Sequence, residues 1–121
     1  MKPSSDPIPL TPAVFYILLA LADGDKHGYA IMKQVRQDSK GKLKMGNGTL
    51  YGSIKRMLAD GLIAEAGDRL DPTLDGERRR YYTLTDGGRQ AFKTEMQRYL
   101  DVAALAQERQ ITSRSSVLLG L

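Results

Sequence analysis

The chain has 121 residues, a length that fits one domain around a single hydrophobic core. With 41% hydrophobic and 26% charged residues, we expect it to fold rather than to remain disordered. It contains no cysteine, which excludes disulfides and thiolate metal sites. Its longest apolar run, residues 13–22, is shorter than the ~20 residues of a membrane span. We therefore expect a cytoplasmic protein with no membrane partner.

Two helices are predicted in the first third of the chain. Thr11 is a good N-cap and Pro12 a good first helical residue, so a helix begins there and continues through the apolar run 13–22. A second helix spans about 27–38, with Ile31 on its apolar side.

His27 and Tyr29 stand at the start of the second helix. One imidazole in a chain without cysteine does not make a zinc site, and no local motif supplies a nucleophile with an orienting acid, so we expect no metal, no cofactor and no enzyme activity. His27 is therefore interpreted as structural or capping. Tyr29 either packs in the core or directs its hydroxyl at a phosphate.

A third helix begins near Gly46 or Asn47, either of which serves as its cap, and ends at Gly61, which supplies a left-handed cap. Its core stripe is formed by apolar residues at i, i+4, i+7 and i+8: Leu50, Ile54, Met57 and Leu58. Its opposite face is small or basic: Thr49, Gly52, Lys55 and Arg56. On this face we expect Arg56 to read a base and Lys55 to contact a phosphate.

Positive charge is concentrated around these helices. The net charge is +4, yet residues 26–56 hold eight basic residues against the single acid Asp38, a net of +7 that leaves −3 for the other 90 residues. Such a basic block is typical of a site for a polyanion, and the alternative is a solvated lysine-rich surface.

A β-hairpin is predicted next. Residues 62–66 and 80–84 have the composition of strands, and the polar segment 67–79 between them contains turn signals, so we expect a long mobile tip. Three consecutive arginines, Arg78, Arg79 and Arg80, open the return strand and would neutralise phosphates on both sides of the ribbon.

The last helix is predicted from Thr85, its N-cap, to about residue 110. Its apolar positions repeat in steps of 4, 3, 4 and 3: Phe92, Met96, Tyr99, Ala103 and Ala106. This spacing indicates a helix seam, which we assign to a homodimer interface, the alternative being packing on its own domain.

These elements predict a mainly α (α+β) fold, a winged helix-turn-helix with a long C-terminal dimerisation helix. We assign residues 1–86 to the DNA-binding domain with an N-terminal extension, and 87–121 to the dimerisation helix and tail. The third helix of such a fold enters the major groove of double-stranded DNA while the wing contacts the backbone. The candidate DNA-binding residues are Tyr29, Lys42, Lys44, Asn47, Thr49, Tyr51, Ser53, Lys55, Arg56, Arg78, Arg79 and Arg80.

Four strings of the sequence carry a family resemblance. They are His27-Gly28-Tyr29, Gly48-Thr49-Leu50-Tyr51, Asp60-Gly61-Leu62-Ile63 and Arg79-Arg80-Tyr81-Tyr82-Thr83-Leu84-Thr85-Asp86-Gly87-Gly88. In order and spacing they resemble the PadR family of bacterial transcriptional regulators, over roughly residues 8–105. The resemblance implies a homodimeric repressor of the short subgroup, dimerised by one C-terminal helix. It also implies a small-molecule effector near the dimer interface, as in some members of that subgroup.

The chain departs from the family pattern at two points. Gly52 follows the Leu-Tyr pair, where the family usually has proline. A glycine at this position lowers the stability of the helix by ~1 kcal/mol relative to alanine. The chain has no tryptophan, so an effector site would use Phe15, Phe92, Tyr99 or Met96. The competing interpretation of the whole chain is a winged-helix protein-interaction module without direct DNA readout.

Overall fold

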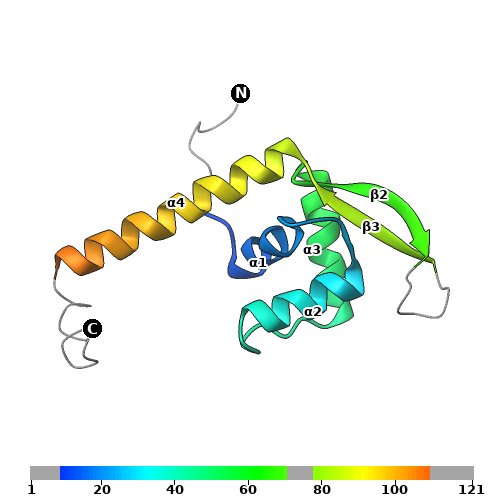
Figure 1. The fold of residues 1–121 in the computed structure, drawn as a ribbon, viewed down its shortest axis with the longest axis horizontal. Helices are drawn as coiled ribbons and strands as arrows, with labels where there is room; N and C mark the ends of the chain where they lie inside the picture. The colour runs from blue at the N-terminus through cyan, green and yellow to red at the C-terminus, as the bar shows by residue number, and fades with distance from the viewer. Residues whose placement is uncertain (1–8, 71–77, 110–121) are drawn as a thin grey trace.

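The computed structural model describes residues 9–70 and 78–109, which form four helices and a small sheet. In chain order the elements are α1 (Pro12–Leu21), β1 (Lys26–His27), α2 (Gly28–Asp38), α3 (Asn47–Ala59), β2 (Ile63–Leu70), β3 (Arg78–Leu84) and α4 (Asp86–Glu108). The β2–β3 hairpin, called the wing below, projects from one side of the three short helices, and α4 projects from the other (Figure 1). The predicted winged helix with a long C-terminal helix is confirmed.

Side-chain caps fix where α1 and α2 begin. The Thr11 hydroxyl accepts from the Val14 N–H at 3.2 Å, and His27 Nδ1 accepts from the Ala30 N–H at 3.2 Å. Both caps agree with the sequence-based assignment, and the lone histidine is a helix cap. Helix α3 begins after Gly46, which offers no side-chain cap.

Helices α2 and α3 end in the same left-handed turn, built from different residues. Gly61 has φ 74°, as predicted for the end of α3. At the end of α2 the equivalent position is Lys40, with φ 55°, and Gly41 donates its N–H to the Arg36 carbonyl at 2.8 Å. A side chain in this conformation costs roughly 1 kcal/mol, which glycine avoids.

The sheet has the order β1-β3-β2 and is antiparallel throughout. Its two-residue strand β1 was not predicted. The predicted tip was too long, because residues 67–70 and 78–79 belong to the β2–β3 ladder. Gly67 (φ 89°), placed at the start of the predicted tip, lies in a bulge between Glu65 and Asp68. The rest of the predicted tip, residues 71–77, lies outside the described residues.

The hydrophobic core lies between the three short helices and the sheet. The predicted apolar stripes meet there, and the largest completely buried side chains are Ile17, Leu18, Ile31, Leu50, Ile54, Met57, Ile63 and Val35. Leu58, the last residue of the predicted α3 stripe, is half-buried at the edge of this cluster. In the part of the chain that the structure describes, no helix has the length and apolar character needed to cross a membrane.

Candidate nucleic-acid interface

Helix α3 carries half of the residues predicted to contact DNA. Five of them are exposed and Ser53 is half-buried: Asn47, Thr49, Tyr51, Lys55 and Arg56. Among the described residues neither Lys55 nor Arg56 has an ion-pair partner, and the helix carries no acid before Asp60. The outer face of α3 is therefore accessible and its cations are not neutralised.

Tyr51 joins α3 to the start of α2. Its phenol ring lies over Gly28, where an added Cβ would come within 2.7 Å of the ring carbon bearing the hydroxyl. The ring thus packs against backbone that only glycine leaves open, while the side chain remains 46% exposed. This contact fixes the angle between the two helices of the helix-turn-helix.

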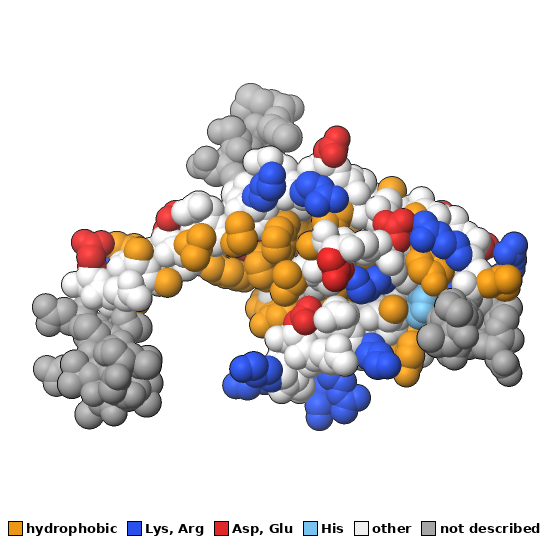
Figure 2. Space-filling model, in the orientation of Figure 1, with side chains coloured by type: hydrophobic (Ala, Val, Ile, Leu, Met, Phe, Trp, Pro, Cys, Tyr) orange, Lys and Arg blue, Asp and Glu red, His pale blue; other side chains and the backbone are white. Residues whose placement is uncertain are grey.

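The first turn of α2 and the segment before α3 supply the neighbouring surface. Tyr29 is 52% exposed, and its ring stacks on that of His27 with the centroids 6.4 Å apart. Lys42 and Lys44 are exposed in the segment between α2 and α3. Figure 2 shows Lys and Arg side chains gathered along the edge of the molecule formed by α2 and this segment.

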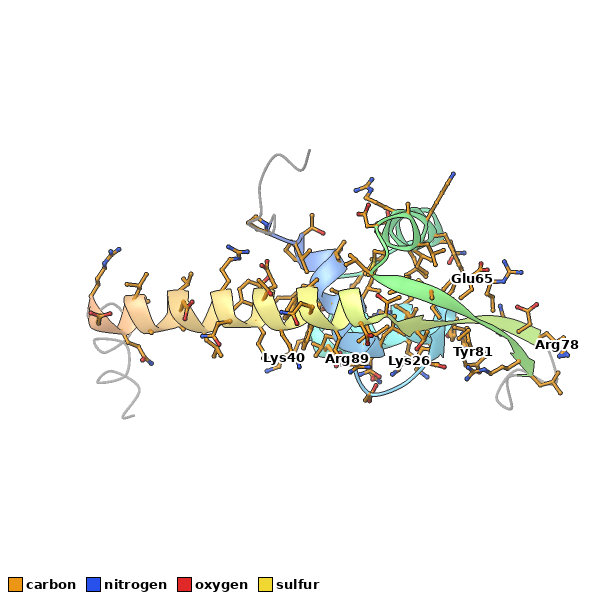
Figure 3. All side chains as sticks on the ribbon, turned by 90° about the horizontal axis from the view of Figure 1, so that it is seen from above. Lys26, Lys40, Glu65, Arg78, Tyr81 and Arg89 are labelled. Atoms are coloured by element: carbon orange, nitrogen blue, oxygen red, sulfur yellow. The ribbon has the colours of Figure 1, made fainter. Side chains whose placement is uncertain are left out.

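The three wing arginines differ in their environments, although the sequence places them together. Arg78 is exposed at the far end of the wing (Figure 3), while Arg79 is half-buried. Arg80 pairs with Glu65 at 3.1 Å and with Asp68 at 3.3 Å. The hydrogen bond to Asp68 and the charge of Glu65 raise the pKa of Arg80. Arg78 is thus the wing arginine best placed to meet a phosphate, and Arg80 would first have to leave two carboxylates.

A second polar cluster, which the sequence did not indicate, fixes the base of the wing. Arg69 of β2 pairs with Asp25 at 2.7 Å, and its guanidinium lies 4.6 Å from the centroid of the Tyr81 ring. Hydrogen bonds from Thr83 and then Arg69 hold the pKa of Asp25 below its ordinary value. The wing is therefore tied to the turn that follows α1.

The predicted dimer seam on α4 divides into two parts. Phe92 stacks on Phe15 of α1 with centroids 5.0 Å apart, and Tyr99 meets the same ring edge-on at 4.9 Å. These two residues pack at least partly on their own domain, the alternative left open above. Met96 and Ala103 are exposed and Ala106 is half-buried. Further exposed apolar side chains continue along α4: Leu100, Val102 and Leu105.

Glu95 is a buried acid on α4 that the apolar periodicity did not single out. It is 3% exposed, and its carboxylate accepts from the Leu10 N–H at 3.0 Å and from Arg98 Nε at 2.8 Å. The segment before α1 is thereby attached to α4. A buried carboxylate with two donors is tolerated because its hydrogen-bonding capacity is used.

Residues 17–94 match the model of the Transcriptional regulator PadR-like family. The chain belongs to this family. It is 34% identical over 89 residues to the transcriptional regulator Rv3488 of Mycobacterium tuberculosis, covering 74% of this chain and 76% of that one. It is also 37% identical over 83 residues, or 69% of its length, to a 37.1 kDa protein encoded in a transposon of Streptomyces fradiae, of which it spans only 21%.

Solved structures of PadR-family proteins share the fold. A PadR-family transcription regulator from Clostridium difficile superimposes with a TM-score of 0.69 at 27% identity, covering 83% of this chain and 99% of that one. Bacillus subtilis PadR in complex with operator DNA has a TM-score of 0.61 at 22% identity, covering 74% of this chain and 48% of that one. The PadR-like family is one of transcriptional regulators rather than enzymes.

The four strings that carry the PadR resemblance meet in two pairs in this PadR-like chain. The first two strings meet where Tyr51 covers Gly28. The other two meet behind α3, where the Thr85 hydroxyl donates to the Gly61 carbonyl at 2.5 Å and Gly88 lies directly on the Leu62 carbonyl. The spacing of the strings in the sequence therefore corresponds to two close contacts in the fold.

Proposed function

We propose that this PadR-like chain binds double-stranded DNA sequence-specifically as a homodimer and acts as a transcriptional repressor in the cytoplasm. The observation that carries the proposal is the exposed, acid-free outer face of α3, flanked by a basic segment and a projecting wing. The helix has the width of the major groove, and the wing reaches the adjacent backbone. The operator DNA bound by Bacillus subtilis PadR supports the same mode here.

Within this proposal some residues contact bases and others contact phosphates. Arg56 is long enough to reach a base edge from the outer face of α3, where guanine offers its guanidinium two acceptors, whereas Gly52 has no side chain and only permits close approach. Lys55, Lys44 and Arg78 contact phosphates. The remaining predicted contacts belong to the same surface: Tyr29, Lys42, Asn47, Thr49, Tyr51, Ser53, Arg79 and Arg80.

The second copy of the chain covers the exposed apolar side chains of α4. Val102 is 59% and Leu105 is 47% exposed, in the half of the helix that extends away from the domain. Apolar surface of this kind on a projecting helix is typical of an interface. Residues 87–121 form the dimerisation helix and tail in this proposal, and residues 1–86 the DNA-binding domain.

Release by a small-molecule effector belongs to the same proposal. In a chain without tryptophan, the aromatic rings of Phe15, Phe92 and Tyr99 gather into one cluster beside α4. Figure 2 shows hydrophobic side chains collected where α4 passes α1. An apolar effector would pack there, next to the proposed dimer interface.

Two single substitutions on α3 test the proposal. After selection of bound sites from a random duplex pool, we expect Arg56→Ala to lower affinity for the selected site by ~1–3 kcal/mol with little effect on scrambled DNA. The matched control, Lys55→Ala, should weaken both duplexes equally, as a phosphate contact does. Sedimentation of the wild type at the same salt concentration measures its mass in solution, which should be that of a dimer. A wild type without salt-dependent retention on duplex DNA would instead be a protein-docking module.

A further inference from the structure

A pocket of about 250 Å³ opens on the outer side of α2. Four of its residues are spaced i, i+3, i+4 and i+7 on one face of α2, and two come from the segment that leads into α3: Tyr29, Met32, Lys33, Arg36, Lys44 and Met45. The last two stand within three residues of Asn47, where α3 begins. The pocket therefore lies at the junction of the two helices of the helix-turn-helix.

Three cations converge on this pocket without an acid. Lys33, Arg36 and Lys44 are all exposed, and none has an ion-pair partner among residues 9–70 and 78–109. The one acid of α2, Asp38, is held by the Gln34 amide at 2.9 Å. Like charges brought together in this way repel one another until an anion joins them.

Three other cations of the described chain are paired with acids. Lys26 is paired with Asp23, and Arg69 with Asp25. Arg98 is paired with Glu95 at 2.8 Å. Cations that position the wing and α4 are thus paired with acids, whereas the pocket cations, like Lys55 and Arg56 of α3, have no such partner among the described residues.

The segment that closes the pocket is fixed in place rather than loose. The left-handed Lys40 turns the chain back toward α2. The buried Ser39 hydroxyl then accepts from the Leu43 N–H at 2.9 Å. Met45 is 9% exposed and anchors the segment in the core. The pocket is therefore formed before a ligand arrives, which reduces the entropy lost on binding.

Size and lining together define the ligand. The volume is below the roughly 300–1,000 Å³ of sites for drug-sized molecules, so it suits one phosphate with part of the group that carries it. Three cations match the charge of a phosphate monoester, about −2, better than that of a carboxylate, and a backbone phosphodiester, which carries about −1, still offers them two unesterified acceptor oxygens. Met32 and the Tyr29 ring offer an apolar wall to the attached group.

We propose that this pocket is a phosphate-binding site, with Lys33 and Arg36 as binding residues beside Lys44 and Tyr29. The phosphate comes either from the DNA backbone next to the start of α3 or from a free nucleotide. The first source rests on the proposed function, and the second does not. The site is separate from the outer face of α3 and from the wing.

The first arm of the test uses the full chain without DNA. AMP and adenosine are titrated into the protein at low salt while the backbone amide NMR signals of residues 29–36 and 44–45 are followed. We expect AMP, and not adenosine, to shift these signals to saturation in the wild type. The double variant Lys33→Ala/Arg36→Ala should lose the shifts. The control Arg89→Ala/Lys93→Ala removes two exposed cations from α4 and should keep them.

The second arm measures duplex affinity of the same proteins at several salt concentrations. Because the pocket holds one phosphate per chain, its loss should lower the slope of log affinity against log salt by ~0.9 per bound chain in the pocket variant, and the α4 control should keep the wild-type slope. If the pocket variant loses AMP binding, the ligand is the phosphate of a free nucleotide. If it loses only affinity for the duplex, the ligand is a phosphate of the DNA backbone. If neither arm separates the pocket variant from the control, the proposal is overturned. A wild type that binds no DNA contradicts the proposed function, while the AMP arm still tests the pocket.

Discussion

The wing and α4 project from opposite sides of the same three-helix core, but they are attached by different chemistry (Figure 1). The inner part of the wing is held in the core by Ile63, Tyr82 and Leu84, whereas its outer part is attached by a polar contact, in which Arg69 of β2 reaches Asp25 beyond the hairpin. At α4 the attachment is mainly apolar and close-packed, with Phe92 stacked on Phe15 and Gly88 pressed against the Leu62 carbonyl.

The difference predicts how each projection responds to its surroundings. Exposed ion pairs contribute up to about 1 kcal/mol and are screened by salt, so the attachment of the outer part of the wing depends on ionic conditions. Packed apolar surface contributes more and is insensitive to salt. The outer part of the wing, which we propose to contact phosphates, is thus held by a salt-dependent contact, whereas α4, which we propose to contact a second protomer, is held by packing.

The largest effect is expected at Gly88. An added Cβ would overlap the Leu62 carbonyl, which is backbone and cannot move aside, so Gly88→Ala should lower the free energy of unfolding by more than about 3 kcal/mol. Gly52→Ala is the matched control, because a Cβ there meets open space, and it should stabilise α3 by ~1 kcal/mol. Urea denaturation compares them, and equal stabilities would refute the close packing of α4.

A smaller effect is expected at Phe92. Removing its half-buried ring from Phe15 should cost about 2 kcal/mol in Phe92→Ala, independent of salt. Leu100→Ala, on the same helix but 55% exposed, should cost less than about 0.5 kcal/mol in the monomer. Denaturation at low protein concentration, with and without 1 M salt, separates the two. A salt-dependent loss at Phe92 would remove the contrast with the wing.

The smallest effect is expected at the base of the wing. The pKa of Asp25 is lowered in the folded chain, so its contribution is complete at neutral pH and is lost as the pH falls below its ordinary value of 3.8. Asp25→Asn should therefore destabilise the chain by less than about 1 kcal/mol at pH 7, less at high salt, and not at all near pH 2. Thermal unfolding across this pH range measures the difference. A deficit that persists at pH 2 would mean that packing, not charge, attaches the wing.

Features set by neighbouring residues were predictable from the sequence. The caps Thr11 and Thr85, the left-handed Gly61 and the apolar stripe of α3 depend on side chains within a few positions. Each bonds or packs against its own helix, so its signal is local.

Features that depend on distant partners were not predictable. Strand β1 exists because Lys26 and His27 pair with residues more than 50 positions away, and Gly67 lies in a ladder that only β3 reveals. The burial of Glu95 depends on Leu10, 85 positions earlier. The same holds for Arg80, which was predicted to contact DNA together with its neighbours. In the structure it pairs with two acids of the adjacent strand, Glu65 and Asp68.

The joint between α3 and α4 makes the long helix a lever. Thr85 donates to the Gly61 carbonyl and caps the first turn of α4, so the turn after α3 and the start of α4 are bonded directly to each other. A helix of 23 residues is ~34 Å long, and a rotation of about 10° about the joint displaces its free end by roughly 6 Å. A force applied at that end acts on α1, through Phe92 and Tyr99 packed on Phe15, and on the turn after α3. The angle at which two such levers cross in the proposed dimer would therefore set the spacing of the two α3 helices, and with it the half-site spacing that fits.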